Sequence, residues 1–318
     1  MKPLVAIGIP VYNGDKHLAE CLESIRNQTY ENWECVVANN QSTDHTLSIA
    51  ESYAKIDSRF RVVTNPEFVD MKTNFNNAHK YCNEAKYFKV VCADDWIFPE
   101  YLEKMVDVME SNPGAGICSS YRIDNKIVGC YGLDIYSAPL FPGREVLDHE
   151  LLYKYDVTGS ETTVLYRIET LKKTKSYPVI FSDNSYHFDT ELAFELLSIS
   201  DLAFVFQVLS YTRRHELTFT SQISVRFRTS LNLRENSLYK YKQGIPELEK
   251  EYHEVRIKYG YFLFIQWIKG ENKCLDWHHK HIPLERRFKP GEIITSIGFT
   301  FVKKIRNAIS KVITGRNL

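Results

Sequence analysis

The chain has 318 residues and carries 40 Lys and Arg against 40 Asp and Glu, so its formal net charge is zero. With 44% hydrophobic and 25% charged residues, its composition is that of an ordinary globular protein and excludes a fibrous or disordered chain. A neutral chain without a long basic run does not support nucleic-acid binding as the main activity. We expect one α/β domain of roughly 200–250 residues with a smaller appendage.

The cysteines and the hydropathy of the chain indicate in which cellular compartment the protein is expected. The seven cysteines are scattered, without a CxxC pair or metal-ligand spacing, and predict free thiols in a reducing environment. The N-terminus shows no basic leader or cleavage site, so we expect no export. The most apolar stretches, Ala203–Leu209 and Tyr261–Ile268, are far shorter than the ~20 residues that span a bilayer. We therefore expect a cytoplasmic protein without a transmembrane helix.

The first 120 residues alternate short apolar runs with amphipathic stretches, a pattern typical of βαβ units that build a parallel sheet. Strands are predicted at Leu4–Ile9, Glu34–Ala38, Phe60–Val63, Tyr87–Val91 and Ala115–Ser119. Apolar residues at helical spacing predict helices around Leu18–Ile25 and Leu102–Met109. Ligands of such sheets bind beyond the carboxyl ends of the strands, so we expect the site there.

The second half of the chain is less regular. Residues 120–180 are irregular apart from a predicted strand at Thr162–Tyr166. A helix at Phe188–Leu197 and a strand at Ala203–Val208 follow, and from about residue 231 the pattern is mostly helical. We expect a ligand-binding domain over residues 1–230 and a helical region over residues 231–318.

Two carboxylates, Asp94 and Asp95, directly follow the predicted strand Tyr87–Val91. Paired hard oxygen ligands suit Mn²⁺ or Mg²⁺, with positions left for water and substrate. The alternative is a helix cap or a solvated turn.

Five polar segments occur in a fixed order along residues 9–99. They read IPVYNG from Ile9, NQTY from Asn27, STD from Ser42, NFNNA from Asn74, and CADDW from Cys92 followed by Pro99. In this order and spacing they resemble the family 2 inverting glycosyltransferases. The resemblance implies a glycosyltransferase-A fold, which is Rossmann-like with a mostly parallel central sheet flanked by helices, here with a C-terminal helical appendage.

The resemblance also implies roles for single residues. Those assigned to the nucleotide-sugar donor are Pro10, Val11, Tyr12, Asn13, Asn39, Asn74, Asp94, Arg213 and Arg214, and those assigned to the metal are Asp94, Asp95 and His215. Two positions depart from the family pattern: Cys92 replaces the leading Asp of the metal motif, and Asn39 replaces an Asp that accepts a hydrogen bond from uracil. Arg213, Arg214 and His215 have the alternative of a solvated turn and a structural histidine.

Asp189 opens the predicted helix Phe188–Leu197 and is the catalytic base by resemblance. Displacement at an anomeric carbon needs a proton acceptor beside the incoming hydroxyl, which a carboxylate supplies. The alternative is that Asp189 only caps this helix.

The C-terminal 48 residues hold ten Lys and Arg against four Asp and Glu. Ile294, Ile297, Phe301, Ile305, Ile309 and Val312 form an apolar stripe at helical spacing. A basic amphipathic helix fits an anionic membrane surface, or it covers the catalytic domain or a partner.

Taken together, the sequence predicts a metal-dependent, non-processive Leloir hexosyltransferase that uses Mn²⁺ or Mg²⁺. It would move one sugar with inversion from a nucleotide-sugar to a glycan or lipid-linked acceptor in surface polysaccharide biosynthesis. The enzyme would be cytoplasmic or peripheral at the inner face of the membrane, with no nucleic-acid partner. The alternative is a catalytically silent sugar-nucleotide-binding protein, which the departures at Cys92 and Asn39 keep open.

Overall fold

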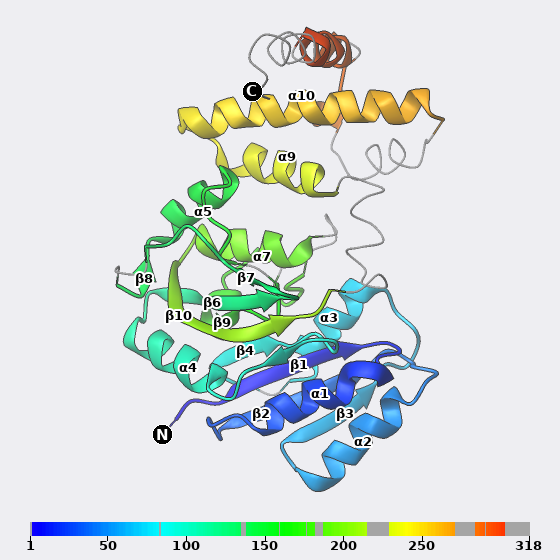
Figure 1. Cartoon of the computed structure of the whole chain (residues 1–318), viewed down its shortest axis with the longest axis vertical. Helices are drawn as coiled ribbons and strands as arrows, with labels where there is room; N and C mark the ends of the chain where they lie inside the picture. The colour runs from blue at the N-terminus through cyan, green and yellow to red at the C-terminus, as the bar shows by residue number, and fades with distance from the viewer. Residues whose placement is uncertain are drawn as a thin grey trace. The chain divides into compact units, whose positions relative to one another are not determined.

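The computed structural model describes residues 2–302 except 83, 135–137, 159, 176, 182–186, 215–228, 271–283 and 290. The described residues fall into two compact units, one up to Arg214 and one from Thr229. The first unit is α/β with one mixed sheet, and the second is helical (Figure 1).

The sheet of the first unit has the strand order β3-β2-β1-β4-β9-β6-β10-β5, with β7 beside β6 and β8 beside β10. Its strands are β1 (Val5–Val11), β2 (Trp33–Asn39), β3 (Phe60–Thr64), β4 (Tyr87–Val90), β5 (Trp96–Ile97), β6 (Ala115–Asp124), β7 (Ile127–Gly129), β8 (Leu140–Phe141), β9 (Leu165–Arg167) and β10 (Asp201–Thr212). The longest ladders, β6–β10, β1–β2, β2–β3 and β1–β4, are parallel. The predicted mostly parallel sheet is confirmed.

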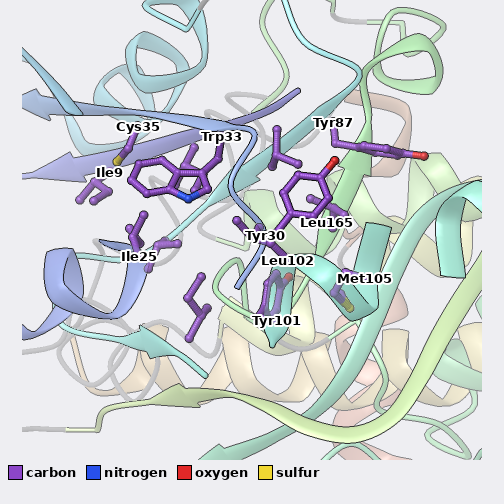
Figure 2. Packing of buried hydrophobic residues seen from close by; sticks show 14 of the residues in the cluster. Ile9, Ile25, Tyr30, Trp33, Cys35, Tyr87, Tyr101, Leu102, Met105 and Leu165 are labelled. Atoms are coloured by element: carbon purple, nitrogen blue, oxygen red, sulfur yellow. The ribbon is translucent and has the colours of Figure 1, made fainter. Parts of the chain in front are cut away.

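Helices cover this sheet because its central strands are apolar on both faces. They are α1 (Asp15–Arg26), α2 (Thr46–Ile56), α3 (Met71–Lys80), α4 (Tyr101–Ser111), α5 (Gly143–Leu151), α6 (Ile168–Leu171) and α7 (Phe188–Leu197). Every second residue of β1 enters one core cluster, together with the buried faces of α1 and α4. Figure 2 shows this packing, with Ile9 of β1, Ile25 of α1 and Met105 of α4.

The opposite face of β1 contacts α3. A Cβ added at Gly8 would lie 3.0 Å from the Cβ of Ala78 in α3, so a glycine there permits close packing of helix on strand. The first half of α3 also carries Asn74, whose Nδ2 donates to the carbonyl of Ala38 near the carboxyl end of β2. Both faces of the parallel part are thus covered, which leaves its strand ends as the accessible edge.

Most predicted elements of the first unit are confirmed within three residues at each end, although β6 ends five residues and β10 four residues later than predicted. Two expectations are wrong. Residues 120–180 contain α5, whose buried Val146, Leu147 and Leu151 make it a packed helix and not irregular chain. The strand expected at Thr162–Tyr166 is β9, Leu165–Arg167, because Glu161 to Thr163 form a turn whose side chains face polar partners.

The second unit consists of α9 (Thr229–Tyr241), α10 (Pro246–Ile268), the 3₁₀ turn Leu284–Arg286 and helical residues 291–302. Glu235 of α9 is 1% exposed and accepts hydrogen bonds from Arg256 of α10 and from Arg286. Two cations on one buried carboxylate compensate the cost of its desolvation. None of the described helices combines the length and hydrophobicity that crossing a lipid bilayer requires.

Candidate active site

Two loops at the carboxyl ends of β1 and β2 are tied together by hydrogen bonds. The amide of Asn13 donates to Ser42 Oγ at 3.0 Å, and Asn13 Oδ1 accepts the amide of Thr43 at 2.8 Å. The amide of Gly14 donates to Thr46 Oγ1 at 2.8 Å. Asn13 adopts φ +50°, a left-handed conformation that asparagine tolerates better than most residues. The two loops therefore form one fixed edge.

Aromatic side chains stand at this edge. Pro10 and Val11 are buried within β1, whereas the next residue, Tyr12, is 49% exposed. The ring of Tyr12 packs edge-on against Phe68 with centroids 4.9 Å apart, and Phe68 is itself 60% exposed. Exposed rings that support one another offer a planar surface on which a nucleobase can stack. Phe68 was not predicted from the sequence.

Asn39 and Asn74 are buried behind this edge. Asn39 Nδ2 donates to Thr64 Oγ1 at 3.1 Å, and Asn39 Oδ1 accepts the amide of Ser42 at 3.2 Å. Asn74 Nδ2 donates to the carbonyl of Ala38 at 3.2 Å, and its Oδ1 accepts from Asn65 at 2.8 Å. Both amides thereby fix the end of β2 and the loop that follows it.

Cys92, Asp94 and Asp95 gather where β4 ends. The Cys92 sulfur and one carboxylate oxygen of each aspartate lie within 4.8 Å of one another. Asp95 is 3% exposed, and burial beside Asp94 raises its pKa to about 7. A divalent cation would offset the repulsion that raises the pKa of Asp95, so the two carboxylates fit the implied metal.

Two partners hold the Asp95 carboxylate in place. Its Oδ2 accepts the hydroxyl of Thr162 at 2.6 Å, and its Oδ1 accepts the amide of Arg213 at 2.8 Å. The Arg213 guanidinium donates from Nε to the carbonyl of Asp94 at 3.0 Å and pairs with Glu20 at 2.5 Å. Arg213 is therefore attached to the Asp-Asp segment through both backbone and side chain.

Arg214 differs from its neighbour. Its guanidinium pairs with Asp124 at the end of β6, while the side chain stays 69% exposed. The next residue, His215, lies outside the described residues.

Asp189 lies in the first turn of α7. The helix begins at Phe188 with His187 as its N-cap, so Asp189 is not the N-cap residue. Asp189 Oδ1 accepts the amide of Thr190 at 2.8 Å, and burial raises the pKa of its carboxyl. A carboxylate with a raised pKa is a stronger proton acceptor, as a general base requires.

Glu161 is a buried acid that sequence reasoning missed. It is 3% exposed, its Oε1 accepts the hydroxyl of Tyr166 at 2.7 Å, and burial together with the charge of Asp189 raises its pKa to about 8. Its neighbour Thr162 bonds to Asp95. The Glu161–Thr162 segment therefore contacts the Asp-Asp pair and lies close enough to Asp189 for its charge to act on Glu161. The sequence signal for this segment was the pair of polar residues, Glu161 and Thr162, shortly before the apolar strand β9.

Lys89 fixes that segment from β4. It is fully buried and donates from Nζ to the carbonyls of Glu161 at 3.1 Å, Thr162 at 2.6 Å and Val164 at 3.1 Å. Burial lowers the pKa of Lys89 to about 7. A lysine in the otherwise apolar run YFKVV was the sequence signal for this contact.

Comparison with known proteins shows the family. The model described as "Glycosyl transferase family 2" matches residues 6–172, more than half of the chain. The chain belongs to glycosyl transferase family 2. The match includes the two tied loops and the Asp94–Asp95 pair. The chain has the glycosyltransferase-A fold expected from its sequence, as its structural neighbours show.

Two relatives illustrate the range of the family. An uncharacterised glycosyltransferase of Haemophilus influenzae is 34% identical over 185 residues, which cover 55% of this chain and 57% of that protein. The Escherichia coli UDP-Glc:α-D-GlcNAc-diphosphoundecaprenol β-1,3-glucosyltransferase WfgD is 28% identical over 185 residues, covering 58% of this chain and 67% of its own length. The chain thus matches little more than half of the first of these proteins.

Two solved structures have the same fold. S. aureus TarS 1–349 in complex with UDP-GlcNAc superposes with a TM-score of 0.62 at 18% identity, covering 94% of this chain and 80% of that one. The mannosyltransferase PcManGT from Pyrobaculum calidifontis, in complex with GDP-Man and Mn²⁺, gives 0.56 at 16% identity, covering 95% and 81%.

Proposed function

We propose that this chain is an inverting glycosyltransferase that moves a sugar from a nucleotide-sugar to a hydroxyl of a glycan or lipid-linked acceptor, in surface polysaccharide biosynthesis. The family match over residues 6–172 carries this proposal, because it spans the edge where the candidate donor residues meet. Residues 1–230 would form the catalytic domain and residues 231–318 the helical region. The name of WfgD includes a UDP-sugar donor and a lipid-linked acceptor, and TarS was solved in complex with UDP-GlcNAc; both support these substrate classes.

The donor would bind at the tied loops of β1 and β2. Tyr12 and Phe68 offer ring faces for the base, and Pro10, Val11 and Asn13 shape the wall beside them. Asn39 and Asn74 act through the loop that they support, since their side chains already have partners.

The diphosphate would lie beside the Asp-Asp pair. Asp94 and Asp95 would hold Mn²⁺ or Mg²⁺, and His215 is proposed to join them. When bound, the cation neutralises charge that develops on the departing diphosphate. Arg213 is attached to this segment through its amide and its guanidinium, so it would supply positive charge beside the diphosphate, and Arg214 is proposed to add to that charge.

Asp189 would act as the base on the acceptor. As the acceptor oxygen bonds to the anomeric carbon and the bond to the diphosphate breaks, Asp189 takes the hydroxyl proton. Attack from the face opposite the diphosphate inverts the anomeric configuration. The raised pKa of Asp189, caused by burial, strengthens it as an acceptor.

We also propose that the C-terminal region binds an anionic membrane surface, where a lipid-linked acceptor would lie. In the helix at residues 291–302, Ser296 is 2% exposed whereas Ile294, Phe301 and Val302 are at least 64% exposed. The sequence continues with Lys303 and Lys304 and has no Asp or Glu after Glu292. An outward apolar face next to basic residues fits an interfacial helix.

A panel of nucleotide-sugars, assayed for binding and for release of the nucleoside diphosphate with and without Mn²⁺, tests the proposal. We expect one sugar donor to raise the unfolding temperature and to release its diphosphate when Mn²⁺ is present. Binding without release would favour the silent sugar-nucleotide-binding protein, which the residues at Cys92 and Asn39 suggest as the second candidate.

A further inference from the structure

A cysteine lies within the candidate cation site. Cys92 Sγ and one oxygen each of Asp94 and Asp95 lie within 4.8 Å of one another. Cys92 is partly exposed, whereas Cys21, Cys35 and Cys118 are buried in the core. Because its sulfur lies this close to the carboxylate oxygens, the thiol is within reach of an ion held by Asp94 and Asp95.

The backbone of Cys92 is held on both sides. Its amide donates to Thr162 Oγ1 at 3.1 Å, and its carbonyl accepts the amide of Asp95 at 3.0 Å. The same Thr162 hydroxyl donates to Asp95 Oδ2 at 2.6 Å. One threonine thus links the backbone of Cys92 to the carboxylate of Asp95.

Sulfur changes which ion such a site prefers. Mg²⁺ takes hard oxygen ligands and dehydrates reluctantly, whereas thiolates favour softer cations such as Zn²⁺ and Cd²⁺. We propose that Cys92 is a ligand of the cation site and that its sulfur shifts the preference of the site from Mg²⁺ toward Zn²⁺ and Cd²⁺. This inference rests on the proposed function only in placing the cation at Asp94 and Asp95.

Coordination by Cys92 requires that its proton leave to solvent as the sulfur binds the ion. A bound divalent cation reverses the sign of the local field and favours the thiolate.

Cadmium titration of the full chain, in the presence of UDP, tests the inference. A sulfur-to-cadmium charge-transfer absorption should appear in the wild type and vanish in Cys92→Ser. The dissociation constant for Cd²⁺ should rise in that variant by at least the roughly 10–100-fold that loss of an outer-shell partner costs. Cys82→Ser is the matched control, because Cys82 is also partly buried but lies after α3, outside the cluster.

Two further measurements keep the inference testable if the Cys92→Ser variant does not fold. A ¹¹³Cd NMR signal of the wild type should lie in the thiolate range, and Cys92→Asp should move the preference back toward Mg²⁺. Absence of Cd²⁺ binding, an absorption that persists in Cys92→Ser, or an oxygen-only ¹¹³Cd shift would overturn the inference. Sugar transfer is measured separately, as release of UDP in the presence of Mn²⁺. Failure of the proposed function can therefore be told apart from failure of the inference about Cys92.

Discussion

Thr162 donates its hydroxyl to Asp95 Oδ2 at 2.6 Å, although 67 residues separate them in sequence. This contact links the turn before β9 to the Asp-Asp segment after β4. Because Lys89 holds the same turn by three carbonyls, Asp95 is positioned by a rigid support on its buried side. Thr162 is therefore a positioning residue for the proposed cation site.

Thr162→Val removes the hydroxyl at nearly constant volume. We expect the dissociation constant for Mn²⁺ in the presence of UDP to rise roughly 10–100-fold, as is typical when an outer-shell partner of a metal ligand is lost. Calorimetry measures this, and Thr162→Ser should retain most of the affinity. Equal affinity in wild type and Thr162→Val would show that the hydrogen bond does not position Asp95.

Asp94→Asn tests the cation site itself. The substitution removes a charged ligand from an ion held by few protein groups, so we expect Mn²⁺-dependent UDP binding to weaken and Mn²⁺-independent binding to stay unchanged. Asp107→Asn, at an exposed position of α4, is the control. Unaltered affinity for UDP with Mn²⁺ would mean that Asp94 is not a ligand.

The buried carboxyl of Glu161 should make the stability of the folded chain depend on pH. Its folded-state pKa of about 8 exceeds its ordinary value of about 4.3, so the folded chain keeps a proton that the unfolded chain releases between these values. The free energy of unfolding therefore falls as pH rises through this window, by at most about 1.4 kcal/mol per pH unit from this group.

Glu161→Gln carries no such proton. Urea unfolding between about pH 5 and 7.5 should give a shallower loss of stability with rising pH in this variant than in the wild type. Glu169→Gln, at a side chain 77% exposed, is the control. Parallel pH profiles for wild type and Glu161→Gln would show that Glu161 ionises normally.

The proposed membrane surface predicts salt-sensitive sedimentation with vesicles of anionic lipid. Each basic side chain near such a surface contributes about 1 kcal/mol, screened within a Debye length of about 8 Å at physiological salt. Ile294→Ser with Phe301→Ser should reduce binding, whereas Ile127→Ser, exposed on β7, should not. The proposal is wrong if the wild type remains in the supernatant. It is also wrong if the double variant at Ile294 and Phe301 sediments as much as the Ile127→Ser control.

The sequence predicted the elements whose periodicity is strong. Apolar residues at helical spacing identified α1 and α4, because each helix buries one face. The short apolar runs identified the parallel strands, because these are buried on both faces of the sheet. The helix α5 was missed, since its few apolar residues lie within a stretch rich in Tyr, Gly and Pro. The local pattern there was too weak to predict a helix.

The arrangement of the site was less predictable. The order of the motifs pointed to Asp94, Asp95 and Asp189, but not to the partners of Asp95. Arg213 donates its amide to Asp95 across 118 residues, and that pairing depends on how β10 lies beside β5. Sequence spacing does not show which residues contact one another, so the bond between Thr162 and Asp95 and the burial of Glu161 became evident only from the fold.

The rate of sugar transfer by the Asp189→Asn variant is the most direct test of the proposed chemistry. With the donor that the nucleotide-sugar panel identifies and a matching acceptor, the variant should lose roughly 10²–10⁴-fold in turnover, because a general base contributes about that much. Its affinity for the donor should stay unchanged, and Glu191→Gln, in the same helical turn, should remain active. Near-normal turnover by Asp189→Asn, or a wild type that binds the donor and never transfers its sugar, would contradict this mechanism.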